Sequence, residues 1–168
     1  MNLMLSLIDY ILSRRSIRKY EKKEIPEKTI NQILKTGQNA PSAANKQPFH
    51  FIILKDKEIK KKISTTFSRF IKDVPIVIVG CANEKALLTG KWAVIDTAIA
   101  MQNMVIAAWT LGVGSCWIGS FSEKKVKQLL KIPDKWKVVA LITLGYPAEQ
   151  PKQRKKKTTE EMFSQNTF

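Results

Sequence analysis

The stretch KWAVIDTAIAMQNMVIAAWTLG, residues 91–112, is the longest periodic apolar segment of the chain. Apolar residues lie on nearly all sides of the helix it predicts, and its five alanines allow close approach by other elements. Such a helix is expected to be buried all round, which in a chain of 168 residues is easier if a second subunit covers part of it. Asp96, Gln102 and Asn103 interrupt the apolar run and argue against a membrane span.

Short apolar strands and amphipathic helices alternate around this segment. Buried strands are predicted where β-branched runs are bounded by turn residues, at 49–54, 75–82 and 136–147, with a shorter strand after the glycine-rich loop at 112. Helical spacing marks residues 3–13, 25–37, 56–67 and 122–132. In the third of these helices, Ile59, Ile63 and Phe67 are expected on the inner face. The pattern predicts one α/β or α+β domain over residues 1–168.

Composition leaves several classes of function open. The formal net charge is +15, which suits an anionic partner such as a nucleic acid, a membrane surface or a phosphate-bearing ligand. Most of the lysines are scattered along the chain, and we attribute those to solubility. The N-terminal apolar run lacks a preceding basic residue and contains Asp9, so it is not a convincing signal peptide, and a cytoplasmic location is expected.

The chain offers little catalytic machinery of its own. Cys81 and Cys116 lie in apolar segments without a CxxC motif, which predicts buried and inert thiols, and one histidine makes a structural zinc site improbable. His50 lies within an apolar strand, where a packed or edge histidine is more common than a base. GVGSCWIG, residues 112–119, misses the dinucleotide-binding spacing because Trp117 stands where the third glycine is required. If the protein is an enzyme, a cofactor is expected to supply the chemistry, and no metal is expected.

A cluster of basic residues follows the first predicted helix. SRRSIRKY, residues 13–20, places four cationic side chains in eight positions. Taken alone, this segment is either a solvated helix end or a site that holds an anionic group.

Four separated segments together resemble the nitroreductase family of FMN-dependent oxidoreductases. They are RRSIRKY (14–20), APSAANKQPFHF (40–51), DTAIAMQNMVIAAWTLGVGSCWIG (96–119) and LGYPAEQPKQRKK (144–156), in the family's order. The resemblance implies an α+β fold with a central, mostly antiparallel sheet flanked by helices. It also implies an entwined homodimer with FMN at the subunit interface and a basic tail, from about residue 150 to 168, that wraps the partner.

The resemblance also assigns the cofactor-binding residues. It places Arg14 at the FMN phosphate, Arg15 and Ser16 at the phosphate and ribityl chain, and Arg18 near the flavin N1/O2 edge. A fixed cation at that edge stabilises the anionic reduced flavin. A loop of the other subunit supplies Pro41, Ser42, Asn45 and Gln47, whose side-chain amides suit the mixed donor and acceptor edge of the ring. The remaining implied contacts are Ile118, Gly119 and Ser120 near flavin N5, with Gly119 allowing close backbone approach, and Arg154 and Lys156 at the phosphate, with Lys152 as runner-up.

The activity implied by the resemblance is hydride transfer from NAD(P)H through FMN to a nitroaromatic, quinone or similar acceptor, in a ping-pong sequence. No protein side chain needs to act as a catalytic acid or base, and neither a nucleic acid nor a membrane is an expected partner. Two alternatives stay open: an FMN-sequestering protein without useful turnover, and, less favoured, a basic nucleic-acid-binding protein.

Overall fold

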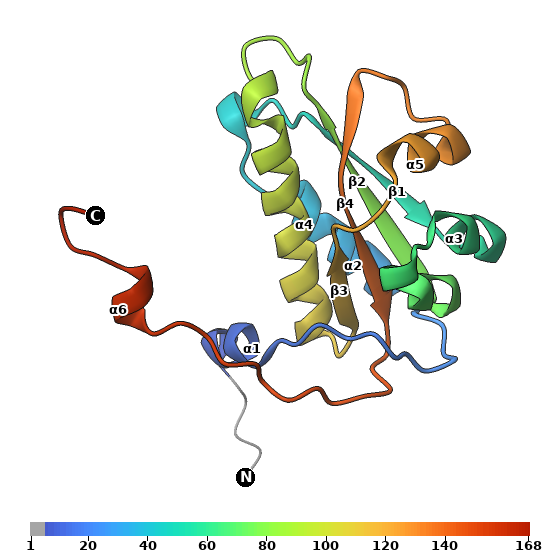
Figure 1. The fold of residues 1–168 in the computed structure, drawn as a ribbon, viewed down its shortest axis with the longest axis horizontal. Coiled ribbons are helices and arrows are strands. Elements are labelled where there is room, and N and C mark those ends of the chain that lie inside the picture. Colours follow the sequence, from blue (N-terminus) through green and yellow to red (C-terminus); the bar gives the residue numbers. More distant parts are fainter. Residues whose placement is uncertain (1–5) are drawn as a thin grey trace.

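An antiparallel sheet of four strands, in the order β1-β2-β4-β3, forms the centre of the protein in a computed structural model that describes residues 6–168. Figure 1 shows this sheet with helices on both faces. The strands are β1 (Phe49–Leu54), β2 (Ile76–Asn83), β3 (Gly114–Ile118) and β4 (Trp136–Gly145). The helices are α1 (Leu7–Ser13), α2 (Glu27–Gln38), α3 (Lys57–Ile63), α4 (Ala93–Thr110), α5 (Glu123–Leu130) and α6 (Thr159–Met162), with 3-10 turns η1 (Ala43–Asn45), η2 (Thr66–Asp73) and η3 (Gly90–Trp92). The predicted antiparallel α+β fold is confirmed.

Helix α4 packs against one face of the sheet beside α2. Met101 and Met104 on its inner side are buried with Ile78 of β2 and Ile142 of β4 in one apolar cluster. The two helices approach closely because α2 has Gly37 at their contact, where an added Cβ would lie 2.1 Å from the Cε atom of Met104. Close packing of this kind fixes α4 relative to the sheet.

The outer side of α4 is not buried in the single chain, so the expectation that this helix is covered all round would need a second subunit to supply the cover. Ile95 is 49% exposed and Ile99 is 37% exposed. Together with Val94, Ala98 and Trp117 they line an apolar hollow of about 520 Å³. Residues Gly90–Thr110 are long and apolar enough to cross a membrane by length and composition, but the inner side of α4 lies in the core, as in a globular domain.

The other face of the sheet is covered by α3, η2 and α5. Ile63, Ile71 and Val126 from these elements are buried there against strand residues. The expectation for Phe67 is wrong, because its side chain is 85% exposed. Helix α3 ends at Ile63 and the chain turns into η2, so Phe67 no longer shares a helical face with Ile59 and Ile63.

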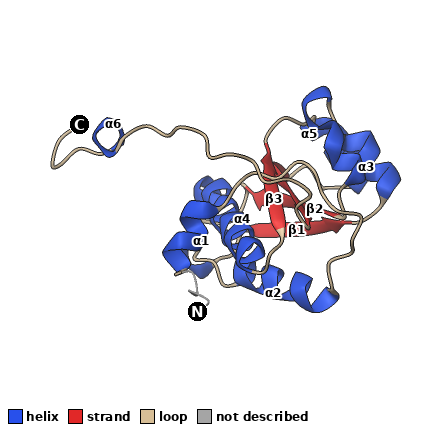
Figure 2. Ribbon diagram, turned by 90° about the horizontal axis from the view of Figure 1, so that it is seen from below, coloured by secondary structure: helices blue, strands red, loops and turns tan. Residues whose placement is uncertain are grey.

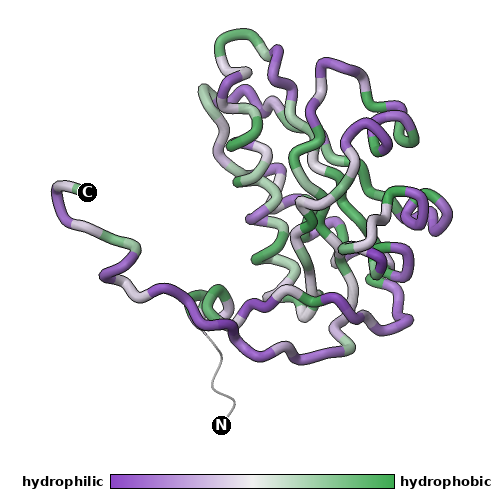
Figure 3. The backbone as a smooth tube through the Cα atoms, viewed as in Figure 1, coloured by the Kyte–Doolittle hydropathy of each residue, from purple (hydrophilic) through white to green (hydrophobic). Residues whose placement is uncertain are grey.

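The C-terminal residues extend away from the domain as an arm (Figure 2). The arm carries α6, and at the C-terminal end of this helix the side chains of Met162 and Phe163 are 59% and 69% exposed. Figure 3 shows a hydrophilic segment between the sheet and α6. The arm places apolar side chains where a single chain offers them no cover.

Candidate functional site

The segment from Arg14 to Tyr20 pairs first with the start of β3 and then with the residues that follow β4. The Ile17 N–H donates to the carbonyl oxygen of Ser115 at 2.9 Å, and Ser16 and Ser115 form a parallel bridge. Ile17 is 1% exposed, whereas Arg18 is exposed. The chain thus buries Ile17 and presents Arg18 to solvent, with Ser16 half-buried beside Ser115.

The chain that follows β4 returns along the same segment. The Glu21 N–H donates to the carbonyl of Tyr146 at 2.9 Å, and the Ala148 N–H donates to the carbonyl of Lys19 at 3.0 Å. The carboxylate of Glu149 accepts hydrogen bonds from the backbone N–H groups of Arg18 and Lys19. The basic segment is therefore joined to the start of β3 at Ser16 and Ile17 and to the start of the tail from Arg18 to Glu21.

Tyr20 fixes the end of this segment to the sheet. Its hydroxyl lies 2.6 Å from the carbonyl oxygen of Ile17 and 2.6 Å from Oγ1 of the fully buried Thr143. Burial raises the pKa of Tyr20 above its ordinary value, so the hydroxyl stays neutral and can donate. Tyr20 thereby contributes to the position of Arg18 two residues earlier.

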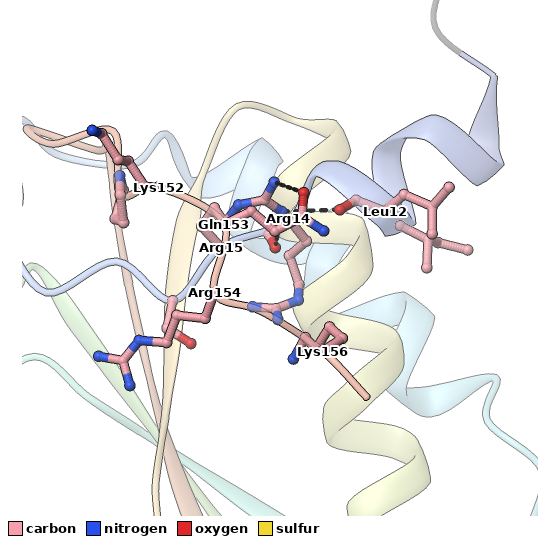
Figure 4. A pocket seen from close by; sticks show the side chains of 10 residues that line it. Leu12, Arg14, Arg15, Lys152, Gln153, Arg154 and Lys156 are labelled. Atoms are coloured by element: carbon pink, nitrogen blue, oxygen red, sulfur yellow. Dashed lines mark hydrogen bonds between the residues drawn. The ribbon is translucent and has the colours of Figure 1, made fainter. Parts of the chain in front are cut away.

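The paired segments form a pocket of about 280 Å³ that gathers basic side chains from both ends of the chain (Figure 4). Arg15 donates to the carbonyl oxygens of Leu12 and Arg14, each at 2.9 Å, and to Oε1 of Gln153 at 3.0 Å, which joins the end of α1 to the tail. Arg14 is half-buried and lines the same pocket. The basic residues that line this pocket, named the cation pocket below, are Arg14, Arg15, Lys152, Arg154 and Lys156.

None of these five side chains forms a salt bridge with a carboxylate in the described part of the chain. Cations held close together without counter-charges repel one another, and a bound anion removes that repulsion. Guanidinium groups match phosphate oxygens with paired N–H donors. The residues present therefore fit the phosphate end of FMN. The pocket brings together all five basic residues that the sequence analysis assigned to the phosphate: Arg14, Arg15, Arg154, Lys156 and the runner-up Lys152.

Ile118, Gly119 and Ser120 lie farther along the same edge of the sheet. Ile118 ends β3 and is 6% exposed, whereas Gly119 and Ser120 are exposed. A Cβ added at Gly119 would meet no atom within 4 Å, so a ligand can approach this backbone freely. From Ser115, beside Ser16, to Gly119 the edge spans about 13 Å. The cation pocket and Gly119 thus mark two ends of one elongated surface.

The loop with Pro41, Ser42, Asn45 and Gln47 lies elsewhere. It is held at the N-terminal end of α4, where the Ala43 N–H donates to Oδ2 of the buried Asp96 at 3.1 Å. The Gln47 N–H donates to Oγ of Ser42 at 2.9 Å, and the Gln47 amide donates to the carbonyl of Asn45 at 2.9 Å. Pro41, Asn45 and Gln47 are exposed.

The loop and the cation pocket lie at opposite ends of α4 (Figure 1). Nε1 of Trp109, near the C-terminal end of α4, donates to Oγ of Ser13 beside Arg14 at 3.0 Å, whereas Asp96 holds the loop near the other end. Asp96 and Trp109 are about 20 Å apart along the helix axis. Within one chain, the structure therefore does not bring the loop residues to Arg14.

The cysteines and the histidine form no catalytic group. Both thiols are free and buried, as predicted from the sequence. Burial raises the pKa of Cys81 to about 11, and it also raises the pKa of Cys116. His50 packs edge-on against Trp136 at a centroid distance of 5.9 Å, at the far edge of the sheet from β3. Among the described residues, no cluster of metal-ligating side chains occurs.

Four residues that position the site were not found from the sequence. They act through single long-range contacts that leave no periodic or compositional signal: Tyr20, Asp96, Glu149 and Gln153.

Comparison with known proteins identifies the class to which this fold and site belong. The model of the nitroreductase family matches residues 11–78 and 68–146. This chain belongs to the nitroreductase family, which confirms the resemblance stated from its motifs.

Individual relatives cover nearly the whole chain. A Methanothermobacter thermautotrophicus protein, provisionally named NADH dehydrogenase/NAD(P)H nitroreductase, is 36% identical over 154 residues, which cover 88% of this chain and 80% of the relative. The structure of an FMN-dependent nitroreductase from Clostridium difficile superposes with a TM-score of 0.86 at 30% identity, covering 96% of this chain and 99% of that one. A nitroreductase family protein from Clostridium novyi superposes with a TM-score of 0.79 at 35% identity, covering 89% of each chain.

The raised thiol pKa values predict slow alkylation of the folded protein. At pH 8, iodoacetamide should leave Cys81 and Cys116 unmodified, because burial both blocks access and disfavours the thiolate. Mass spectrometry checks this, with protein unfolded in guanidinium as the control in which both thiols react. The pKa of the Cys81 thiol is higher in the folded protein, at about 11, than in the unfolded chain. Its ionisation therefore favours the unfolded chain, and the free energy of unfolding should fall as the pH rises from about 9 to 11. Rapid labelling of folded protein at pH 8 would contradict the assignment of inert thiols.

Proposed function

We propose that this chain is an FMN-dependent oxidoreductase that takes NAD(P)H as reductant and reduces nitroaromatic, quinone or similar acceptors in the cytoplasm. Membership of the nitroreductase family supports this, as do a relative named for NAD(P)H and a related structure described as FMN-dependent. The observation that carries the proposal is the cation pocket, whose five basic side chains have no carboxylate partner among the described residues. FMN supplies the redox chemistry when bound, by accepting a hydride and passing two electrons on in a ping-pong sequence.

The cation pocket would hold the phosphate. Arg14 is the first contact, because its guanidinium lines the pocket and makes no hydrogen bond within the described residues. The Arg15 guanidinium already donates hydrogen bonds to carbonyl oxygens and to the side chain of Gln153, so it also holds the tail against the N-terminal segment. Arg154 and Lys156 would close over the phosphate from the tail, with Lys152 as a further cation.

The remainder of the cofactor would extend along the edge of β3. Ser16 lies beside the pocket and can meet the ribityl chain, and Arg18 follows it on the same side of the extended segment. A guanidinium near the N1/O2 edge of the ring would stabilise negative charge there. Ile118, Gly119 and Ser120 would then border the ring, with the backbone of Gly119 accessible to N5.

A homodimer would complete the site. A two-fold axis perpendicular to α4, passing through its exposed apolar side, would run the two copies of this helix antiparallel and place the same surface of each subunit in the contact. The N-terminal end of one α4, with Pro41, Ser42, Asn45 and Gln47, would then lie beside the partner's cation pocket. Ile95 and Ile99 would be buried between the two helices, and the arm beyond residue 150 would find cover on the second subunit.

Replacement of Arg14 tests the phosphate assignment. Arg14→Ala should weaken FMN binding by roughly 10- to 150-fold, because one charge-assisted interaction with the phosphate is lost. Riboflavin, which lacks the phosphate, should bind the variant and the wild type equally. Titration of the apoprotein with each flavin by fluorescence quenching measures both constants. Lys62→Ala, an exposed lysine on α3, is the control for net charge and should change neither. Equal losses of affinity for FMN and riboflavin would contradict the assignment.

Mixed dimers test whether the amide loop acts on the partner's cofactor. One subunit carries Arg14→Ala and the other carries Asn45→Ser with Gln47→Met, and both homodimers should bind FMN poorly. If the loop acts in trans, both lesions fall in one site of the mixed dimer and the other site is intact. FMN stoichiometry on dual-tagged dimers should therefore return to about one tight site per dimer. Absence of any tight site would show that the loop acts within its own chain, whereas wild-type binding of FMN by the loop-variant homodimer would show that the loop does not act at all.

A further inference from the structure

A second cavity lies between β1 and the loop that joins α5 to β4. Figure 1 shows α5 and this loop on the side of the sheet away from α4. The cavity has a volume of about 370 Å³, which is within the range of small-molecule sites. Its lining is mainly apolar and includes Ile52, Cys81, Ile132 and Trp136, together with the polar residues His50 and Lys131. Because β1 and β3 are opposite edges of the sheet, this cavity is separate from the site described above.

A β-bulge in β4 turns Trp136 toward the cavity. Ile142 of β4 is buried in the apolar cluster beneath α4. Because side chains two residues apart share a face of a regular strand, Val138 and Trp136 would point the same way as Ile142. The register of β4 against β2 instead shifts by one residue between Gly80 and Cys81, and beyond this shift Val138 and Trp136 pack in the cluster on the other face. The bulge therefore supplies the cavity with an aromatic wall.

The loop from α5 to β4 is fixed around the cavity by its own backbone. Lys131 ends α5 in the left-handed conformation, with a φ of +54°, and the Ile132 N–H donates to the carbonyl of Lys127 at 3.0 Å. The Trp136 N–H donates to the carbonyl of Pro133 at 3.0 Å, which closes the turn into β4. Ile132 is thereby 8% exposed, whereas Lys131 remains exposed at the rim of the cavity. The loop forms a preordered wall, which lowers the cost of binding a ligand.

His50 extends the aromatic wall. It lies directly opposite Cys81 in the antiparallel pair of β1 and β2, and its ring meets the Trp136 ring edge-on at an interplanar angle of 61°. The nitrogens of an imidazole can donate and accept hydrogen bonds, so His50 adds a polar group to a mostly apolar wall. Burial raises the pKa of the Cys81 thiol to about 11, so this thiol stays neutral and adds to the apolar lining. No carboxylate from the described residues lines the cavity.

We propose that this cavity binds a small planar aromatic carboxylate of one or two rings, with its ring against Trp136 and its carboxylate toward Lys131. The apolar and aromatic lining favours a ligand that buries ring area. The ammonium group at the rim, with no carboxylate beside it in the lining, favours an anionic ligand over a neutral or cationic one. The inference goes beyond the proposed function and is independent of it, because this cavity shares no lining residue with the cation pocket.

The single histidine of the chain reports directly on this cavity. The probe is 2-naphthoate, added to untagged protein that carries ¹³C-labelled histidine and is saturated with FMN. We expect the ring signals of His50 to shift and saturate in NMR, because an aromatic ring against Trp136 changes the magnetic environment of the imidazole. The neutral analogue 2-naphthamide should bind roughly two- to fivefold more weakly, because it lacks the charge that interacts with Lys131.

Substitutions separate the contribution of the charge from that of the ring. Lys131→Asn keeps a residue that tolerates the left-handed conformation, and it should weaken 2-naphthoate roughly two- to fivefold while leaving 2-naphthamide unchanged. Lys135→Asn removes the same charge from an exposed position of this loop outside the cavity, so it should change neither ligand. Trp136→Leu should weaken both ligands by about two- to tenfold, because the aromatic contact is lost. If Trp136→Leu fails to fold, the two lysine variants still decide the outcome.

Three results would overturn the inference. The first is the absence of any shift of the His50 signals at millimolar 2-naphthoate, even if the flavin spectrum changes, since that change would place the ligand at the flavin. The second is equal affinity of the wild type for 2-naphthoate and 2-naphthamide. The third is an equal loss of affinity in Lys131→Asn and Lys135→Asn, which would reduce the effect to net charge. A protein that takes up no FMN would refute the proposed function instead, and the same titration without flavin would still test this cavity.

Discussion

The pairing of residues 16–21 first with the start of β3 and then with the start of the tail is the constraint on which the site depends. The Arg18 N–H and the Glu149 carboxylate that accepts it are 131 residues apart in the chain. Because that contact and the Lys19–Ala148 hydrogen bond fix the register, the tail is led back to Arg14. The cation pocket exists only through this pairing, since its basic residues come from both ends of the chain.

Charge explains why such a pocket needs a ligand. Its five cationic side chains line one pocket without a carboxylate partner in the described chain, while the carboxylate of Glu149 accepts from backbone N–H groups. Repulsion among these cations opposes folding of the tail against the N-terminal segment, and a phosphate dianion would reverse that effect. Under the proposed function, binding of the cofactor and ordering of the tail would therefore be coupled. In this account a few basic residues, those of the cation pocket, would bind the phosphate, while most of the other lysines and arginines remain solvated.

Local sequence patterns predicted the elements of this fold, because buried strands and helices carry their periodicity within a few residues. The strand at 49–54 matches the prediction, and α4 was expected as the central helix. The single chain leaves Ile95 of α4 half exposed, so the expected burial of this helix on every side stays a prediction about a second subunit. The prediction for Phe67 is wrong because the helical spacing of apolar residues in the sequence continues to Phe67, whereas α3 ends at Ile63. Asp96 and Glu149 have no local signature, since each acts on backbone N–H groups of a distant segment.

The most direct test of the account is the flavin content of the protein itself. The native protein, or apoprotein reconstituted with micromolar FMN, should carry one FMN per chain, show a flavin absorbance spectrum and lose its yellow colour on anaerobic titration with NADH or NADPH. Folded protein that stays colourless after reconstitution would contradict the central claim that the cation pocket holds the cofactor.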